Sequence, residues 1–586
     1  MKQKESLKTL PYATIALLTI ATLGGCYRDD PTTDLSTPVD DGTKSVLRVK
    51  YLNGGLRDEW ITNVCNDFCE LYKDYSFEEG KVGVTIIPEF IKSNAQVSSI
   101  KNNPNDVFWA EDTDYFTCVS TGQVYDISNW LNEKVAVGPS KAEEKTILDK
   151  FTDSSKRYFA VKDDGGKDHY YAIPAYENSC FLNYNIDLFD QKCFYFAKDK
   201  TADGMSEGQL NSNDVDDLFV TSPNDERSTG PDGIAGTFDD GLPATYADFH
   251  ALITFMKRSS VTPFIWKGNF PDDLASFGLT AWGGSSGADT LEACLSLGGN
   301  LSDLIEWNNG SIVYQDDGTP KHLNATAITP DNGYLLHQSQ GLLDSLKLAK
   351  IMISNDGKDK NYYKNSMSQS FDHLTAQRYF LNGYAQGIVE QPIGILVDGT
   401  WWNSEANGYY QSETDRLSRH MGIMPVPHPT RTQVGQPNVI VSDRQSMIFV
   451  RSTIAEKTIP VAKAFVQYLN SDVAMNTFSR YTDMLRLMNY EVTDETLKSM
   501  SPYGRAVYAF SKNENTKHIN WVPMSDIAKK NASLLSYRTW GYSFSSSSGD
   551  NNPYTYFATH MNVSAEDHFD AINQYFHTNW SYLLTK

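Results

Sequence analysis

The chain is 586 residues long and carries 73 acidic against 51 basic side chains, for a formal net charge of −22. This acidic surface repels the phosphates of nucleic acids and anionic lipid headgroups, so we expect neither as a partner. The length exceeds what one hydrophobic core accommodates and predicts two or three domains, and 33 Tyr and 11 Trp make the chain rich in aromatic side chains.

Residues 1–25 predict a secretory leader. Three lysines surround the start of the chain, a largely apolar run follows over residues 11–23, and Gly24 and Gly25 end it. The run is shorter than the ~20 residues of a membrane-spanning helix, and small residues before a cleavage point are typical of a signal peptide. The next residue, Cys26, is similar to the lipidated cysteine of a bacterial lipobox. This similarity implies an extracytoplasmic protein with a lipid anchor in a bacterial membrane, and the polar residues 26–45 predict a flexible tether.

Strands that alternate with helices are predicted from residue 46 onward. Residues 46–52, 82–90 and 106–110 are apolar and β-prone, and residues 58–75 carry apolar side chains at helical spacing. This alternation is typical of an α/β protein with a mostly parallel sheet. Residues 170–178 are interpreted as a crossing between two lobes. The remaining predicted elements are a strand and turn at 181–189, helices at 246–256, 374–381 and 462–469, and a strand at 447–450.

Two short apolar segments that we predict to be strands end in tryptophan beside carboxylates. They lie within residues 103–116 and 394–406. An aromatic ring stacks on the apolar face of a sugar, while carboxylates accept hydrogen bonds from its hydroxyls, so the two segments predict a sugar-binding cleft between two lobes. Of the pair at 401 and 402, one ring is expected to pack in the core and the other to face the cleft. The candidate contacts are Trp109, Glu111, Asp112, Trp401 and Trp402.

Five further residues are candidate ligand contacts. Tyr176 and Glu177 follow the crossing and are expected to line the floor of the cleft. Asn53 and Arg57 follow the first strand and could reach sugar hydroxyls. Trp266 is also a candidate, although a core position accounts for it more readily.

Several short motifs occur in a fixed order between about residues 46 and 490. They include Asp106-Val-Phe-Trp-Ala, Tyr171-Ala-Ile-Pro-Ala-Tyr-Glu, Leu242-Pro-Ala-Thr-Tyr-Ala-Asp-Phe, Gly394-Ile-Leu-Val-Asp-Gly-Thr-Trp-Trp and Gly422-Ile-Met-Pro-Val-Pro. Each motif alone is weakly specific. Their order, together with the lipobox, resembles the extracellular solute-binding proteins of family 1, which include maltose-binding protein.

The resemblance implies an α/β periplasmic-binding-protein-like fold of type II, with two lobes joined by a hinge and the ligand cleft between them. The implied lobes are residues 46–175 plus 430–492 and residues 176–429 plus 493–586. It also implies a monomeric substrate-binding subunit, not an enzyme, that captures a sugar or oligosaccharide and delivers it to the permease of an ABC importer. Peptides or amines are alternative ligands within the same family.

Residues 198–243 are rich in Asp, Asn, Gly and Ser and predict an irregular acidic insert in the second lobe. Closely spaced carboxylates with glycines that permit tight turns suit Ca²⁺, although the EF-hand spacing is absent. The alternative is a solvated loop. The candidate calcium ligands are Asp216, Asp232, Asp239 and Asp240.

Six cysteines follow Cys26, at positions 65, 69, 118, 180, 193 and 294. Outside the cytoplasm an even number permits disulfides. Most are expected to be buried thiols, and Cys180 with Cys193 is the one pairing that could close a short loop.

Three other functions compete with this interpretation. A SusD-like glycan-binding lipoprotein would be equally large and aromatic-rich, but its helical repeats disagree with the early strands and the absence of a repeat period. Gly283-Gly-Ser-Ser-Gly matches the nucleophile pattern of esterases, without the buried strand that should precede Ser285. A glycosidase needs only two suitably placed carboxylates, which the sequence can neither identify nor exclude.

Overall fold

The computed structural model describes residues 40–91, 99–111, 115–269, 272–354, 360–442, 446–520 and 553–585. The leader and Cys26 lie outside these residues. Within the described ranges, no helix combines the length and the apolar composition needed to cross a membrane.

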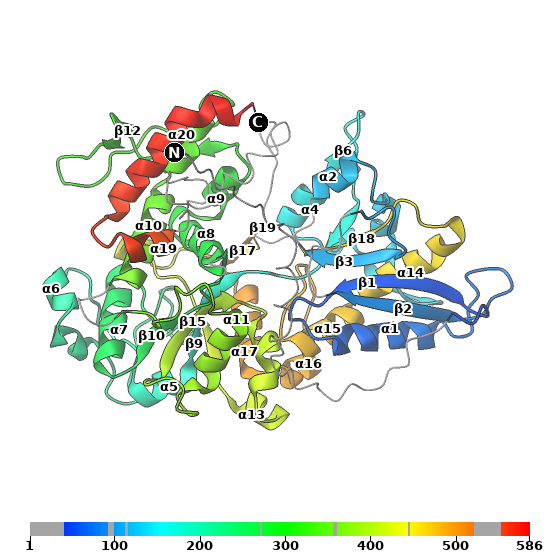
Figure 1. Cartoon of the computed structure of the whole chain (residues 1–586), viewed down its shortest axis with the longest axis horizontal. Coiled ribbons are helices and arrows are strands. Elements are labelled where there is room, and N and C mark those ends of the chain that lie inside the picture. Colours follow the sequence, from blue (N-terminus) through cyan, green and yellow to red (C-terminus); the bar gives the residue numbers. More distant parts are fainter. Residues whose placement is uncertain are drawn as a thin grey trace, which may run out of the picture. The chain divides into compact units, whose positions relative to one another are not determined.

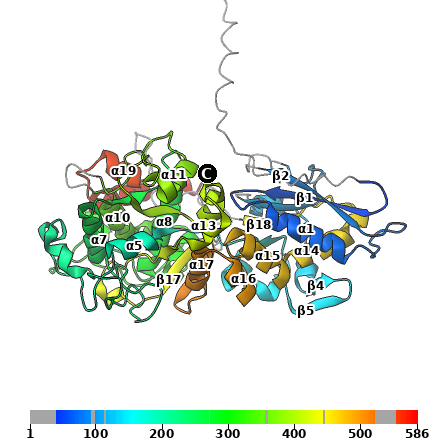
Figure 2. The ribbon, with the colours of Figure 1, turned by 90° about the horizontal axis from the view of Figure 1, so that it is seen from below.

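The first lobe is built on a five-stranded sheet with the order β2-β1-β3-β18-β8 (Figure 1). Its first three strands are parallel, and β18 runs antiparallel to both β3 and β8. The bounds are β1 Ser45–Leu52, β2 Val84–Ile91, β3 Val107–Glu111, β8 Ala172–Pro174 and β18 Ser446–Val450. Helices α1 (Glu59–Leu71), α14 (Ile459–Leu469) and α15 (Asp472–Thr482) pack together beside this sheet (Figure 2).

The second lobe is built on a four-stranded sheet with the order β10-β15-β9-β16. Strand β9 runs antiparallel to both neighbours, and β10 is parallel to β15. The bounds are β9 Cys180–Asn185, β10 Thr262–Ile265, β15 Ile393–Gly399 and β16 Met421–Met424. Its principal helices are α7 Tyr246–Arg258, α8 Asp272–Ser286, α10 Gln340–Ile353, α17 Pro502–Lys512, α19 Pro553–Thr559 and α20 Ala565–Leu583.

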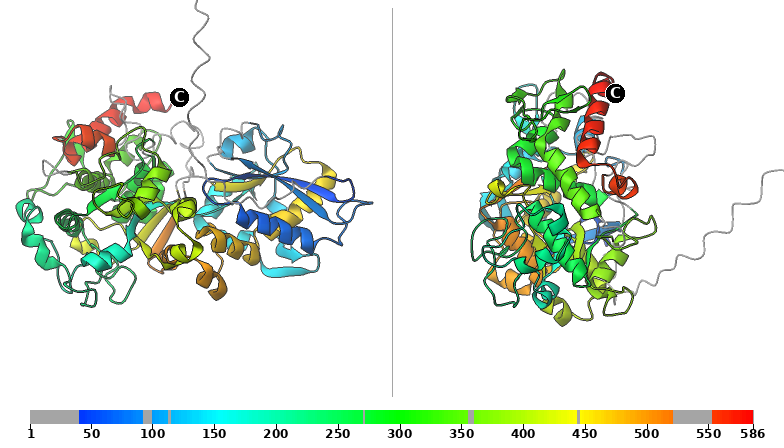
Figure 3. Two further views of the ribbon diagram at one scale, coloured as in Figure 1. Left: turned by 60° about the horizontal axis from the view of Figure 1, so that its bottom comes forward. Right: turned by 90° about the vertical axis from the view of Figure 1, so that its left-hand side faces the viewer.

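The C-terminal helix α20 belongs to the second lobe, where it packs against α10 (Figure 3). Its start follows from the sequence, because Ser564 and Asp567 form a reciprocal capping box. Thr245 and Asp248 cap α7 in the same way. The insert consists mainly of turns with two short helical segments, Glu207–Leu210 and Asn213–Leu218, which agrees with the irregular structure predicted for it.

The predicted elements are present with shifts of a few residues at their ends. The helix expected at 374–381 is α11 (His373–Arg378), which continues as a π-helix over Tyr379–Gly383. All six described cysteines are free, so the pairing of Cys180 with Cys193 is wrong. Four of the six are buried, as expected for thiols that pack as small apolar side chains.

Arg486 lies where the chain passes between the lobes, and it is almost completely buried. Its guanidinium donates to the carbonyls of Ala175 and of Pro174 (3.3 Å) on the crossing segment, and to the carbonyl of Leu469 (3.1 Å) at the end of α14. A further bond runs to Asn470 Oδ1 at 2.7 Å, and the guanidinium carbon lies 4.9 Å from the centre of the Trp109 ring. Burial lowers the pKa of Arg486 to about 9.

Substitution Arg486→Met should lower the free energy of unfolding by about 3 kcal/mol or more, because several buried carbonyls lose their donors at about 1–3 kcal/mol each. Denaturant unfolding of the full chain measures this. The control is Arg480→Met, which removes an exposed arginine from α15 and should cost less than about 0.5 kcal/mol. Equal losses in the two variants would contradict the role given to Arg486.

Candidate ligand site between the lobes

A two-glycine turn of the first lobe passes between carboxylates of both lobes. The turn follows β1, and a Cβ atom at Gly54 would lie 3.0 Å from Oε1 of Glu111, at the end of β3. A Cβ at Gly55 would lie 3.1 Å from Glu405 of the second lobe, and its φ of +91° is one that other residues rarely adopt. Glycine is therefore favoured at position 55, and the backbone of the turn approaches both acids closely.

Glu405 belongs to a cluster of charged and amide side chains at the end of the second sheet. It ends α12 (Trp402–Glu405), directly after β15. Oε1 lies 3.2 Å from His373 Nε2, and Oε2 accepts from Gln377 Nε2 at 2.7 Å. Both partners project from α11, four residues apart and hence on one face of the helix.

Asp398 of β15 is the central acid of this cluster and is 3% exposed. Gln377 Nε2 donates to its Oδ2 at 3.0 Å, and the Gly399 backbone N–H donates to its Oδ1 at 2.7 Å. Lys267, two residues after β10, pairs with Asp273 in the first turn of α8 at 3.0 Å. The cluster therefore combines residues from the ends of β10 and β15 with the starts of two helices.

The carboxyls of this cluster are crowded. The pKa of Asp398 is raised to about 8, because burial disfavours its charged form and Asp273 and Glu405 repel it. The pKa of His373 is raised by its hydrogen bond to Glu405. The arrangement offers many acceptors and few donors, which suits a ligand that brings hydroxyl or ammonium groups.

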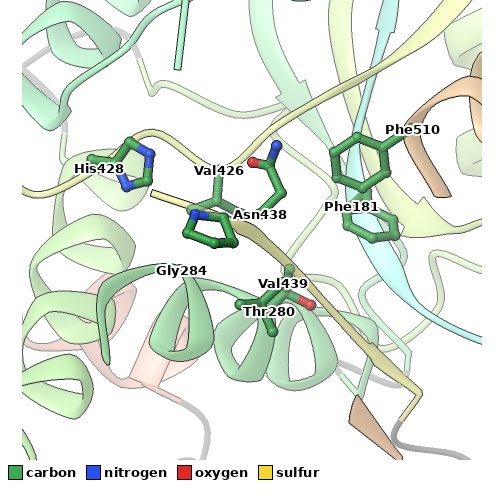
Figure 4. A pocket seen from close by; sticks show the side chains of 9 residues that line it. Phe181, Thr280, Gly284, Val426, His428, Asn438, Val439 and Phe510 are labelled. Atoms are coloured by element: carbon green, nitrogen blue, oxygen red, sulfur yellow. The ribbon is translucent and has the colours of Figure 1, made fainter. Parts of the chain in front are cut away.

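Two cavities lie away from this cluster. The first, of about 10 Å³, has room for roughly one water and lies within the second lobe (Figure 4). Val426, His428 and Asn438 line it together with Phe181 of β9 and Phe510 of α17. The second, of about 500 Å³, is an open groove lined by α4 (Asp153–Phe159) and α9 (Ala288–Leu295), where Arg157 pairs with Glu292 across the two lobes.

No family model matches the chain, and no curated protein matches it. Solved structures match it over nearly its whole length. RafE in complex with raffinose is 12% identical, with 91% of this chain and 99% of that chain covered and a TM-score of 0.52. A chitin oligosaccharide binding protein is 13% identical, with coverage of 92% and 100% and a TM-score of 0.50. The apo-form of RafE from Streptococcus pneumoniae is 13% identical, with coverage of 91% and 98% and a TM-score of 0.50.

The chain has the two-lobed fold of these sugar-binding proteins. The resemblance drawn from the sequence motifs is thereby confirmed at the level of the fold. The boundaries proposed for the two lobes stay a prediction, although the two sheets fall on either side of the crossing as expected.

In this solute-binding fold, most of the predicted tryptophans are packed in the core. Trp109 is 2% exposed, and its ring is covered by Trp60, Tyr176 and Phe478 together with Arg486. Trp266 packs against Tyr362, and Trp402 against Phe380 and Tyr503. Other aromatic side chains pack against these three rings, so the rings are not available to stack on a ligand.

Trp401 is also buried, although at 8% exposed it is the least covered of the tryptophans predicted as ligand contacts. Its ring covers Gly399, since a Cβ there would lie 2.0 Å from the ring atoms. Trp402 has no exposed surface and Trp401 lies against Gly399 of β15, and which of the two faces the cleft stays a prediction.

The polar residues predicted as ligand contacts differ in what they contact. Glu111 lies at the glycine turn, and Asp112 lies outside the described residues. Asn53 donates to Asp58 at 2.6 Å, and Arg57 pairs with Glu59 at 2.9 Å, so both are engaged within their own loop. Their ligand contacts stay predictions.

Sequence reasoning missed Lys267, Asp273, His373, Gln377, Asp398 and Glu405 as site residues. Asp398 and Glu405 lie in the Trp401–Trp402 segment, so the carboxylates beside that pair were a usable signal. The others come from three separate elements, and no local spacing connects them.

The calcium candidates form a tight turn except for Asp216, which instead pairs with Arg258 at 3.0 Å. Asp239 accepts from the Asp232 backbone N–H at 3.0 Å, and Asp240 accepts from that of Gly236 at 2.7 Å. The pKa of Asp239 is raised to about 7 by burial and by the nearby Asp232. Among the described residues, no three His, Cys, Asp or Glu side chains are grouped so as to hold a metal ion.

Glu177 lies at the hinge, where it is 4% exposed and pairs with His518 of β19 (Thr516–Asn520) at 3.3 Å. His518 Nε2 also lies 2.9 Å from the Ser511 carbonyl. Burial alone would raise the pKa of Glu177. The positive charges of His518 and Lys512 have the larger combined effect, so the pKa is lowered overall. Burial likewise opposes the charge on His518, but Glu177 outweighs it and raises the pKa of His518.

The stabilising effect of His518 should therefore depend on pH. Because the pKa of His518 is raised in the folded protein, its ion pair contributes its full stabilisation below about pH 6.5, the pKa of histidine in the unfolded chain. This stabilisation is lost as the pH rises through the folded pKa. The lowered pKa of Glu177 adds stability above about pH 4.3 that is lost as pH falls through its folded pKa. The difference in unfolding free energy between wild type and His518→Gln should thus be largest between about pH 4.3 and 6.5 and shrink toward pH 9.

Denaturant unfolding at several pH values measures this difference. His322→Gln, which replaces an exposed histidine of the second lobe, serves as the control and should give a small difference at every pH. A constant difference for His518→Gln from pH 5 to pH 9 would show that the ion pair contributes nothing.

Proposed function

We propose that this protein is the extracytoplasmic substrate-binding subunit of an ABC importer, that it captures a sugar or oligosaccharide between its lobes, and that it delivers the ligand to the permease. It is not an enzyme in this proposal, and a lipid on Cys26 anchors it to the membrane. The fold supports the proposal, and solved structures of similar fold are described as binding raffinose and chitin oligosaccharide.

The observation that carries the proposal is the approach of the two lobes at the glycine turn. Gly55 of the first lobe approaches Glu405 of the second, and Gly54 approaches Glu111 of its own lobe. A ligand held here contacts both lobes and so favours the arrangement in which they are close together. Trp401, at 8% exposed, keeps more accessible surface than the other tryptophans predicted as contacts, and we assign to its ring the stacking on a sugar.

The rival interpretations have less support. Two α/β lobes disagree with the helical repeats of a SusD-like protein. Ser285 lies within helix α8, not at a turn after a strand, and its hydroxyl donates to Asp344 Oδ2 at 2.6 Å. An esterase nucleophile instead needs a sharp strand-to-helix turn and a histidine partner.

Titration with a panel of mono-, di- and oligosaccharides, followed by tryptophan fluorescence and thermal shift, tests the function. At least one sugar class should give a saturable response. Substitution Trp401→Ala should then weaken binding about fivefold or more, because stacking of one ring contributes on the order of 1 kcal/mol or more.

The control for this substitution is Tyr314→Ala, which removes a ring that is 48% exposed on a distant loop of the second lobe. It should leave affinity unchanged. A folded protein that responds to no sugar would contradict the proposed function, and equal affinity of the Trp401→Ala variant would remove Trp401 from the site.

We also propose a structural Ca²⁺ at the turn of Asp232, Asp239 and Asp240. Binding would draw these carboxylates together, since the structure does not group them around a metal ion, and backbone carbonyls and water would complete the oxygen ligands. Asp240 Oδ1 is buried without a hydrogen-bond partner among the described residues, and the crowding of Asp232 with Asp239 would be relieved by a cation. EDTA should lower Tm by several degrees, and added Ca²⁺ should restore it. The Asp239→Asn variant should lose this response, and an unchanged Tm of the wild type would overturn the proposal.

A further inference from the structure

The side chains around the glycine turn include more carboxyl groups than basic groups. Four carboxyls, those of Glu111, Asp273, Asp398 and Glu405, are accompanied by Lys267 and by His373, which is only partly exposed. Lys267 is already paired with Asp273, and His373 with Glu405. A cation beside these carboxyls favours the ionised form of Asp398, whereas a neutral sugar does not.

The cluster is also short of hydrogen-bond donors. The Gln377 amide nitrogen donates to both Asp398 and Glu405, which fixes the orientation of the amide. Its oxygen, on a side chain with no exposed surface, has no partner among the described residues. A buried acceptor without a donor costs about 1–3 kcal/mol, so the missing donor is expected from a bound molecule.

An ammonium group matches this deficit better than a hydroxyl does. It brings three donors and no acceptor, whereas a hydroxyl brings one donor and two further lone pairs. Its charge also offsets the repulsion between Asp398 and Glu405, and hydrogen bonds from a charged donor to carboxylates are stronger than those from a neutral one.

Resting on the proposed function, we propose that the ligand is an amino sugar whose protonated amine binds between Asp398, Glu405 and the Gln377 amide oxygen. The amine supplies the donors, and the sugar ring extends toward Trp401, whose ring covers the neighbouring Gly399. The specificity of the site for a cation then comes from the second lobe, and the glycine turn of the first lobe closes over it.

A matched series of β-1,4-linked disaccharides tests this inference by isothermal titration at pH 7. The doubly deacetylated glucosamine dimer, its di-N-acetylated form and cellobiose differ only in the group at C2, which is an ammonium, an acetamide or a hydroxyl. The glucosamine dimer should bind at least tenfold more tightly than either relative. Its affinity should fall with rising salt concentration, while that of cellobiose should not.

Two variants separate a direct contact from a general effect. Asp398→Asn should reduce the preference for the amine to about twofold or less, because it keeps the shape and removes the charge. Glu495→Gln, an exposed substitution on α16 (Asp494–Ser499), should leave the preference unchanged. Titrations in buffers of different ionisation enthalpy should also show proton release by the wild type, because amine binding ionises Asp398, and no such release by Asp398→Asn.

The outcomes distinguish this inference from the proposed function. Cellobiose binding as tightly as the glucosamine dimer would overturn the inference and leave the sugar-binding function standing. Failure of all three disaccharides while another, neutral sugar binds would do the same. Absence of binding by every sugar in the panel would overturn both.

Discussion

The end of the first lobe that leads into the crossing depends on one guanidinium buried among carbonyl groups. Arg486 holds the crossing segment at Pro174 and Ala175 against the end of α14, and the face of Trp109 covers it. Burying a charge is costly, and among the described residues no carboxylate pairs with it. The carbonyl dipoles and the ring face replace its lost hydration, so the segments that supply them cannot separate without leaving the charge uncompensated.

A second buried charge extends this constraint to the other lobe. Asp483 caps α15 of the first lobe, and it accepts hydrogen bonds from Arg416, from Asn403 at 2.9 Å and from the Ser501 backbone at 2.8 Å. Asn403 lies in α12, the same short helix that ends at Glu405. The hinge and the ligand site are therefore connected through a single helical turn, and a change in the hinge must alter the position of Glu405 unless that turn deforms.

Much of the fold could be predicted from the sequence, because local signals determined it. The alternation of apolar strands and amphipathic helices, and caps such as Thr245 with Asp248, specify elements within a few residues of where they lie. The site was less predictable. Tryptophans beside acids are visible in the sequence, but whether a ring is covered on both faces, as that of Trp109 is, depends on packing between distant segments. Arg486 gave no signal at all, since its partners are backbone carbonyls that every residue carries.

The acid cluster also shows why charge can be more informative than aromatic content in such a site. Asp273 and Asp398 are each about as buried as the core tryptophans, and repulsion between them opposes folding. Lys267 pairs with Asp273, and Gln377 donates to Asp398, so both carboxyls are held in place before any ligand arrives. Little side-chain freedom therefore remains to be lost on binding. A protein that needed only stability would replace such a cluster with apolar side chains of similar size, as buried ion pairs can be replaced without loss. Its position at the carboxyl ends of β10 and β15, against the glycine turn of the opposite lobe, is therefore better explained by recognition than by folding.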